Sequence, residues 1–216
     1  MELANLQLTL VTLTLASCFL IVGGRRLDSV IKGAATQAVV LAVVTGLRGY
    51  STGVHEMYVA AVLTLLIKGG AIPFILYKVV AKVGSERGIK SYVSIKMSFV
   101  ICCALVIVAF WVSGETLGPA AGIAGRTVPV AIAMMLIGLY LMITRKLAVN
   151  QVVGLLIMEN GIFLAGVGTT NGMPAVVELG IFLDVVVGVL IMGILVFRIN
   201  RAFDTINTEN LRNLRG

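Results

Sequence analysis

A series of long apolar runs, each of about 20 residues, constrains this chain more than any other feature. An α-helix rises 1.5 Å per residue, so about 20 apolar residues cross the ~30 Å hydrocarbon core of a bilayer. Seven runs have this length: 3–22, 30–48, 54–80, 96–113, 127–144, 149–168 and 175–198. Their apolar residues do not alternate with polar ones, so we expect no β-barrel. The sequence predicts an all-α integral membrane protein, a bundle of about seven transmembrane helices.

The composition supports one membrane domain over residues 1–216. Hydrophobic residues make up 59% of the chain and charged residues only 12%, too few to solvate the surface of a water-soluble domain. We divide the domain into five N-terminal helices (1–148), a helical hairpin (149–200) and a polar cytoplasmic tail (201–216). The first residues lack a basic segment ahead of the apolar run, so we expect that run to remain as a span rather than be cleaved.

The basic residues predict the orientation in the membrane. Of the 17 lysines and arginines, fourteen lie in or beside the segments 23–29, 81–95, 145–148 and the tail after 198, which seven spans place on one side. Arg48 and Arg126 lie on the other side, and Lys68 lies within a span. Because cytoplasmic loops carry the positive excess, the N-terminus is predicted outside and the C-terminus in the cytoplasm of a multi-pass protein of the cell inner membrane. The net charge of +7 therefore reflects topology, and we expect no nucleic-acid binding.

Three ionisable residues lie near the middle of spans: Lys68, Glu159 and Asp184. A charge at the bilayer centre costs about 2.5–3.5 kcal/mol on insertion scales, so such residues face protein or water. Counting helix rise from the outer ends puts Glu159 and Asp184 roughly 18–20 Å deep and Lys68 roughly 22 Å deep. We interpret this layer as a site of ion or proton handling. A buried structural ion pair or a polar clamp between helices is the alternative.

Two further features lie close to this layer. Glu178 is about a turn and a half nearer the outside than Asp184, and it is either a stepping point towards the external face or a hydrated residue near a helix start. In the third span, Pro73 has no backbone N–H to donate to Gly69, and Gly70 weakens the helix further. This predicts a kink or local unwinding beside Lys68, with an ordinary packing kink as the alternative.

No constellation of catalytic residues is present. The chain has one histidine, no nucleophile paired with a base, no glycine-rich phosphate loop and no Cys-x-x-Cys. Cys18, Cys102 and Cys103 lie in apolar runs without the spacing of metal ligands, so we interpret them as packing residues. We expect no cofactor, no metal and no catalysis by this chain alone.

The last third of the sequence carries a resemblance to a known family. Residues 153–161 read Val-Gly-Leu-Leu-Ile-Met-Glu-Asn-Gly, and residues 184–190 read Asp-Val-Val-Val-Gly-Val-Leu. These segments resemble the second and third helices of the K-type subunit of respiratory complex I, a helix pair that also occurs in multisubunit sodium/proton antiporters. With four or so helices ahead of that unit, the chain most resembles hydrogenase-4 component E, a membrane subunit of formate hydrogenlyase and related group 4 hydrogenase complexes.

The resemblance implies roles for particular residues. Asp184 falls on the second of the two intramembrane glutamates of the complex I subunit. The position of the first holds Leu156, and Glu159 follows three residues later on nearly the same helical face. The exact partner in a relay is therefore open.

The resemblance also implies partners and a function. The partners are antiporter-like and other membrane-arm subunits, and the basic loops face a soluble arm or anionic lipid. The function is that of a non-catalytic subunit that contributes charged residues to proton or sodium translocation driven by redox chemistry elsewhere. A subunit of a multisubunit cation/proton antiporter and a purely structural scaffold are the alternatives.

Overall fold

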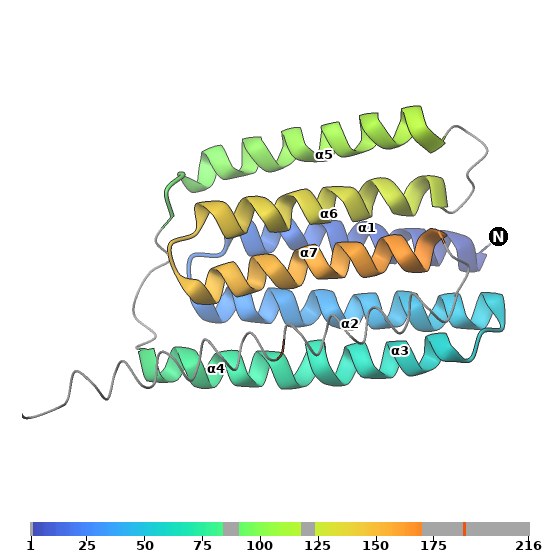
Figure 1. The fold of residues 1–216 in the computed structure, drawn as a ribbon, viewed down its shortest axis with the longest axis horizontal. Helices are drawn as coiled ribbons and strands as arrows, with labels where there is room; N and C mark the ends of the chain where they lie inside the picture. The colour runs from blue at the N-terminus through green and yellow to red at the C-terminus, as the bar shows by residue number, and fades with distance from the viewer. Residues whose placement is uncertain (1, 84–90, 118–123, 170–187, 189–216) are drawn as a thin grey trace, which may run out of the picture.

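Six long apolar helices make up the described part of the molecule, a computed structural model (Figure 1). It describes residues 2–83, 91–117, 124–169 and 188. The helices are α1 (Glu2–Gly23), α2 (Leu27–Thr52), α3 (Glu56–Thr64) with η1 (Leu65–Ala71) and α4 (Ile72–Val83), α5 (Ile95–Leu117), α6 (Ala124–Thr144) and α7 (Ala148–Thr169). They correspond to the first six predicted spans. The predicted seventh span, 175–198, lies outside the described residues apart from Gly188.

The helices run side by side with their chain directions alternating, so their connections fall at two ends of the bundle (Figure 1). The turn between α1 and α2 lies at the same end as the close of α4, the start of α5 and the turn between α6 and α7. A backbone hydrogen bond joins this end: the Tyr92 N–H donates to the Thr144 carbonyl over 3.0 Å. The described basic residues that flank these connections, such as Arg25, Lys96 and Lys146, therefore gather at one end of the bundle.

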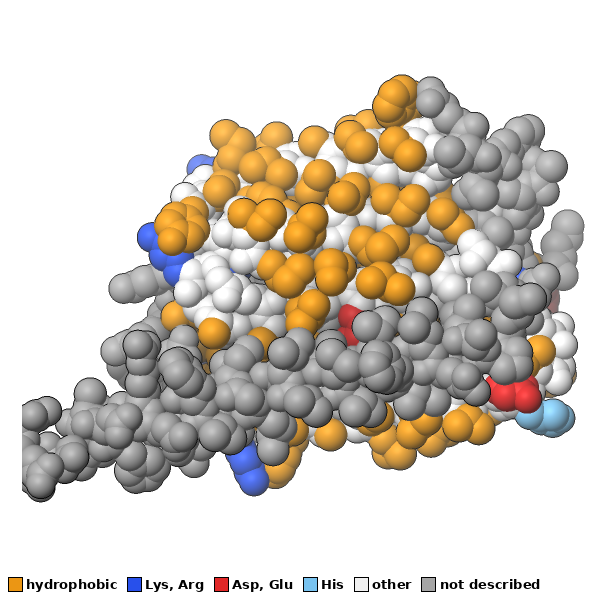
Figure 2. All heavy atoms as spheres, in the orientation of Figure 1, with side chains coloured by type: hydrophobic (Ala, Val, Ile, Leu, Met, Phe, Trp, Pro, Cys, Tyr) orange, Lys and Arg blue, Asp and Glu red, His pale blue; other side chains and the backbone are white. Residues whose placement is uncertain are grey.

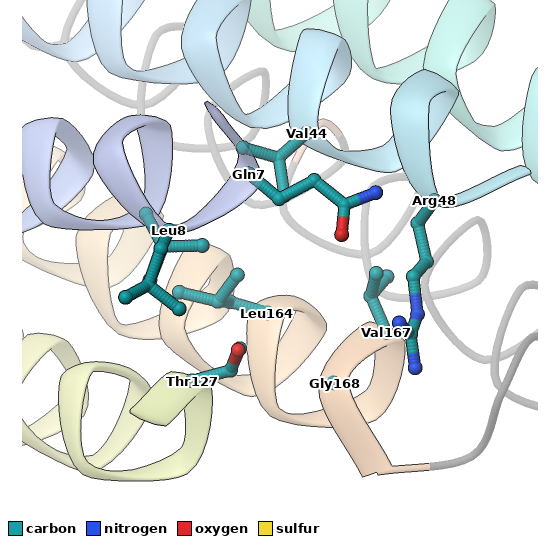
Figure 3. A pocket seen from close by; sticks show the side chains of 9 residues that line it. Gln7, Leu8, Val44, Arg48, Thr127, Leu164, Val167 and Gly168 are labelled. Atoms are coloured by element: carbon teal, nitrogen blue, oxygen red, sulfur yellow. The ribbon is translucent and has the colours of Figure 1, made fainter. Parts of the chain in front are cut away.

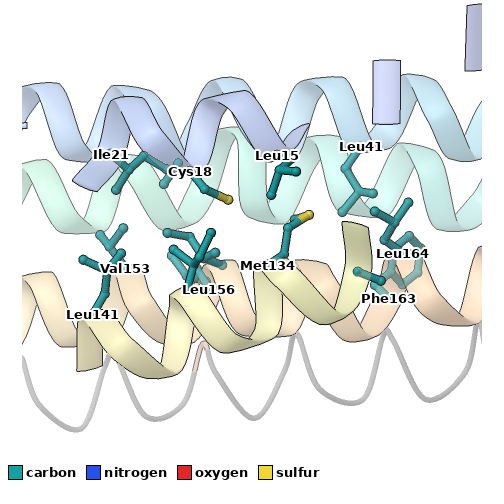
Figure 4. Packing of buried hydrophobic residues seen from close by; sticks show 14 of the residues in the cluster. Leu15, Cys18, Ile21, Leu41, Met134, Leu141, Val153, Leu156, Phe163 and Leu164 are labelled. Carbon is teal, nitrogen blue, oxygen red and sulfur yellow. The ribbon is translucent and has the colours of Figure 1, made fainter. Parts of the chain in front are cut away.

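The core lies between α1, α2, α6 and α7, where aliphatic side chains from all four helices interdigitate (Figure 4). In the most apolar stretch of α7, 67% of the residues are buried. In the same kind of stretch of α5, which packs on α6 at the edge of the bundle, 17% are buried. Large apolar side chains of α5 are therefore exposed, among them Ile107 and Trp111 at 69% and 64%. Figure 2 shows such side chains spread over the described face, a surface that only lipid or a neighbouring protein can cover favourably.

Helices α6 and α7 approach each other so closely because glycines face one another across their contact. A Cβ added at Gly138 would lie 2.6 Å from the Gly154 carbonyl oxygen and 2.6 Å from the Met158 nitrogen. A Cβ at Gly161 would lie 2.8 Å from the Ala131 carbonyl oxygen. Small residues let the backbones of transmembrane helices approach each other in this way. In lipid the hydrophobic effect does not drive helices together, so the dispersion contacts of this close packing stabilise the pair instead.

The third span contains a π-helical segment, η1, at the place where the sequence predicts a kink or local unwinding. At its end the Ile72 N–H donates to the Ile67 carbonyl, five residues back, and Pro73 follows at once in α4. A π-turn inserts an extra residue per turn and is frequent at functional sites. The segment holds Lys68, Gly69 and Gly70, and Lys68 is its buried residue.

Candidate functional site

The core of the bundle contains an ion pair that is shielded from solvent. The Lys68 Nζ of η1 lies 3.1 Å from the Glu159 Oε1 of α7, and both side chains are only 3% exposed. The Phe163 ring, one turn further along α7, flanks the ammonium, with its centroid 5.7 Å from Nζ. Charges in such a low-dielectric place are tolerable only when paired. The contact between the two residues therefore offsets part of the cost of burying each of them.

Amide side chains continue the polar contacts away from this pair. Lys68 Nζ donates to Asn160 Oδ1 over 3.2 Å, and Asn160 Nδ2 donates to Gln37 Oε1 of α2 over 3.2 Å. Gln37 Nε2 donates in turn to the Thr14 carbonyl of α1 over 3.0 Å and to Cys18 Sγ over 3.1 Å. A row of hydrogen bonds thus crosses the bundle from α7 to α1.

Local helix geometry explains why these groups meet. Glu159 and Asn160 are consecutive, so their side chains leave α7 about 100° apart, and Lys68 reaches both. Because α2 packs against both η1 and α7, Gln37 in the middle of α2 can accept from Asn160. Glu159, Asn160 and Gln37 are buried to 3%, 2% and 0% exposure, so water cannot take the place of these partners.

The structure therefore brings together two of the residues singled out from the sequence, Lys68 and Glu159. Asp184 and Glu178 lie outside the described residues, so their place in this layer stays a prediction. The residues predicted to kink the helix, Gly69, Gly70 and Pro73, follow Lys68 in η1 and α4.

Sequence reasoning gave no role to Asn160 and Gln37, although both join the polar contacts. The signal was available: an amide in the middle of an apolar run needs a partner for the same reason that a charge does.

The end of the bundle that carries the basic segments holds a buried arginine. The Arg145 Nη2, just beyond the last residue of α6, donates over 2.7 Å to the carbonyl of Val22 in the last turn of α1. A cation at a helix C-terminus satisfies a carbonyl that has no partner within the helix and interacts favourably with the helix dipole. Burial lowers the pKa of the Arg145 guanidinium. This residue fastens α6 to α1, and we assign it no role in charge transfer.

A cavity opens at the opposite end, between α1, α2, α6 and α7 (Figure 3). Its volume is about 310 Å³ including its mouth, and its lining is mostly aliphatic, with Val44 and Leu164 among the labelled side chains. Gln7 and Arg48 bring polar groups to it, and the Gln7 amide donates to Ser51 Oγ over 3.0 Å. Among the described residues, no three histidine, cysteine, aspartate or glutamate side chains converge as metal ligands would.

The described residues form six apolar helices, and the core between them holds a buried Lys–Glu pair. These features define the class of this chain: it is a multi-pass helical membrane protein with a charged pair in its core. Residues 127–216 match the family of NADH-ubiquinone/plastoquinone oxidoreductase chain 4L. The segment that carries Glu159 and Asn160 falls within this match.

One relative extends the likeness to 94% of the chain. The uncharacterized protein Rv0085 of Mycobacterium tuberculosis is 33% identical over 204 residues, which cover 94% of this chain and 92% of the relative. Hydrogenase-4 component E of Escherichia coli (strain K12) is 29% identical over 120 residues, 56% of this chain and 55% of that protein, and the protein of the same name from Shigella flexneri matches equally. No solved structure matches. The chain therefore belongs to the same family as the uncharacterized protein Rv0085. It is similar to hydrogenase-4 component E and, over residues 127–216, to chain 4L.

Proposed function

We propose that this chain is a membrane-arm subunit of a group 4 [NiFe]-hydrogenase or formate hydrogenlyase-type complex related to complex I. Its task is to supply charged residues for the translocation of protons, or of sodium ions, while the redox chemistry takes place in other subunits. The observation that carries the proposal is the Lys68–Glu159 pair, 3.1 Å apart and 3% exposed in the core of a membrane bundle. The likeness to hydrogenase-4 component E and to chain 4L supports the redox setting.

The mechanism we propose is lateral displacement of charge at mid-membrane depth. Lys68 lies 3.1 Å from Glu159, so a proton that reaches or leaves a neighbouring carboxylate changes how strongly the ammonium is attracted to each side. Asp184 and then Glu178 are the neighbours that the sequence proposes for this role. The subunit would thereby pass an electrostatic signal or a proton between flanking antiporter-like subunits.

The orientation we propose places the N-terminus outside and the basic end in the cytoplasm of the inner membrane, where it faces a soluble arm or anionic lipid. In a cysteine-less background, a cysteine at the exposed position 146 should react with a membrane-impermeant maleimide only in permeabilised cells. A cysteine at the exposed position 55, at the other end of the bundle, should react in intact cells. Equal labelling of both positions in intact cells would contradict this orientation.

The function is tested by Glu159→Gln and Asp184→Asn in the intact complex. Neutralising a carboxylate of the relay should lower the number of protons moved per hydrogen produced by about tenfold, because the cost of charge in the membrane interior then blocks the transfer. The measurement is proton uptake into inverted membrane vesicles together with hydrogen evolution. Glu56→Gln, which alters an exposed carboxylate at the start of α3, is the matched control and should leave the ratio unchanged. Unchanged coupling in both relay variants would refute the proposal.

The same vesicles separate the two rival functions. A subunit of a cation/proton antiporter would exchange ions without hydrogen or formate turnover. A structural scaffold would lose assembled complex on neutralisation of Glu159, yet keep full coupling in each complex that remains. The amount of assembled complex is therefore measured beside the activity.

A further inference from the structure

The amides of Asn160 and Gln37 are oriented by a group that can only accept hydrogen bonds. The Thr14 backbone carbonyl accepts from Gln37 Nε2 over 3.0 Å, so the nitrogen end of the Gln37 amide must face α1. Its oxygen end then faces Asn160 and accepts from Nδ2 over 3.2 Å. This leaves Asn160 Oδ1 directed at Lys68 Nζ, 3.2 Å away. A backbone group of α1 thus determines which end of an amide the ammonium meets.

Burial restricts the Gln37 and Asn160 amides to these orientations. Thr14 and Gln37 are both 0% exposed and Asn160 is 2% exposed. Turning either amide over would set an N–H group against another donor or an oxygen against another acceptor, with no water to repair the loss. Of the two orientations that each amide has, the surroundings therefore select one at both positions.

We propose that Gln37 is a positioning residue for the ion pair: through Asn160 it presents an acceptor oxygen to Lys68 and so holds the ammonium against Glu159. The inference rests on the proposed function only in so far as the pair moves charge; the positioning itself can be measured separately. Amide groups neither gain nor lose protons near neutral pH, so the α1 side of Lys68 orients the lysine and does not conduct.

The groups around Lys68 support this division of roles. Within the described residues, the ionisable side chain in contact with Lys68 is Glu159 of α7. On α2 the contact is made through uncharged Gln37, while the charged residues of α2, α3 and α4 lie nearer to the helix ends, as Lys32, Glu56 and Lys78 do. On the far side of Gln37 stand the Thr14 carbonyl and the Cys18 thiol of α1.

The test is a double-mutant cycle between Lys68→Met and Glu159→Gln, measured on the full chain in mixed micelles by unfolding with SDS. The cycle is run in the native background and again with Gln37→Met, which keeps the length of the side chain and removes both polar ends. If Gln37 positions Lys68, the coupling between Lys68 and Glu159, expressed as a ratio of unfolding equilibrium constants, should fall about tenfold in the Gln37→Met background. A side chain that merely fills space would leave the coupling unchanged, and that result overturns the proposal.

Two additions keep the test decisive. The control is Thr36→Val, a neighbouring position on the exposed face, where the threonine hydroxyl donates to the Lys32 carbonyl of its own helix; it should leave the coupling unchanged. If Gln37→Met folds too poorly for the cycle, the side-chain amide of Asn160 is followed by nitrogen NMR in protein labelled at asparagine. Its hydrogen exchange should be slow in the native chain and at least tenfold faster in the Gln37→Leu variant, because leucine has no oxygen that can accept from Asn160 Nδ2. Equal exchange in both proteins overturns the proposal, whereas failure of the translocation experiment alone refutes only the proposed function.

Discussion

Replacing Lys68 by methionine should lower the free energy of unfolding by about 3–5 kcal/mol, the effect known for removal of one partner from a buried ion pair. The substitution keeps the unbranched apolar stem, so packing against Phe163 changes little. It leaves the Glu159 carboxylate, 3% exposed, without the ammonium that lies 3.1 Å from it. The unfolding equilibrium of the full chain in mixed micelles, titrated with SDS, measures the loss.

A second variant separates loss of the pair from loss of packing. Lys68→Met combined with Glu159→Met removes both charges of the pair, so it should be less destabilised than Lys68→Met alone. If the double variant lost as much stability as the two single variants together, the two residues would not interact. The ion pair would then not contribute to the stability of the bundle.

The depth of Lys68 and Glu159 could be predicted from the sequence because depth depends only on counting residues. Each residue adds 1.5 Å along a helix, so runs of apolar residues fix where Lys68 and Glu159 lie along the membrane normal. Their contact at 3.1 Å agrees with the shared layer. Rotation about each helix axis is set by packing against neighbours, which one sequence does not reveal, and the meeting of these two side chains could therefore not be predicted.

The hydrogen bonds of the amide side chains were harder to predict, although the sequence shows both amides within apolar runs. Asn160 follows Glu159 directly, and Gln37 lies in the middle of an apolar run, where an unpaired amide would be costly. Which partner each finds depends on α2 packing against both η1 and α7, a tertiary fact. The π-helical form of residues 65–71 was equally hard to predict from the sequence. Pro73 and two glycines predict a disturbed helix, but only packing decides between a kink, an unwound turn and a wider turn.

The approach of α6 to α7 makes Gly138→Ala the other substitution with a large expected effect, because the contact positions Glu159. The new Cβ would lie 2.6 Å from the Gly154 carbonyl oxygen and the Met158 nitrogen, backbone atoms that cannot swing aside. The helices must separate, so we expect a loss of about 3 kcal/mol in the free energy of unfolding, at the upper end for overpacking. The SDS titration of the full chain measures it. At Gly114 on the exposed face of α5, where an added Cβ meets nothing within 4 Å, the same change should be neutral or slightly stabilising. Equal stability of the two variants would mean that the backbones of α6 and α7 are not in contact, and Glu159 would then owe its position to some other neighbour.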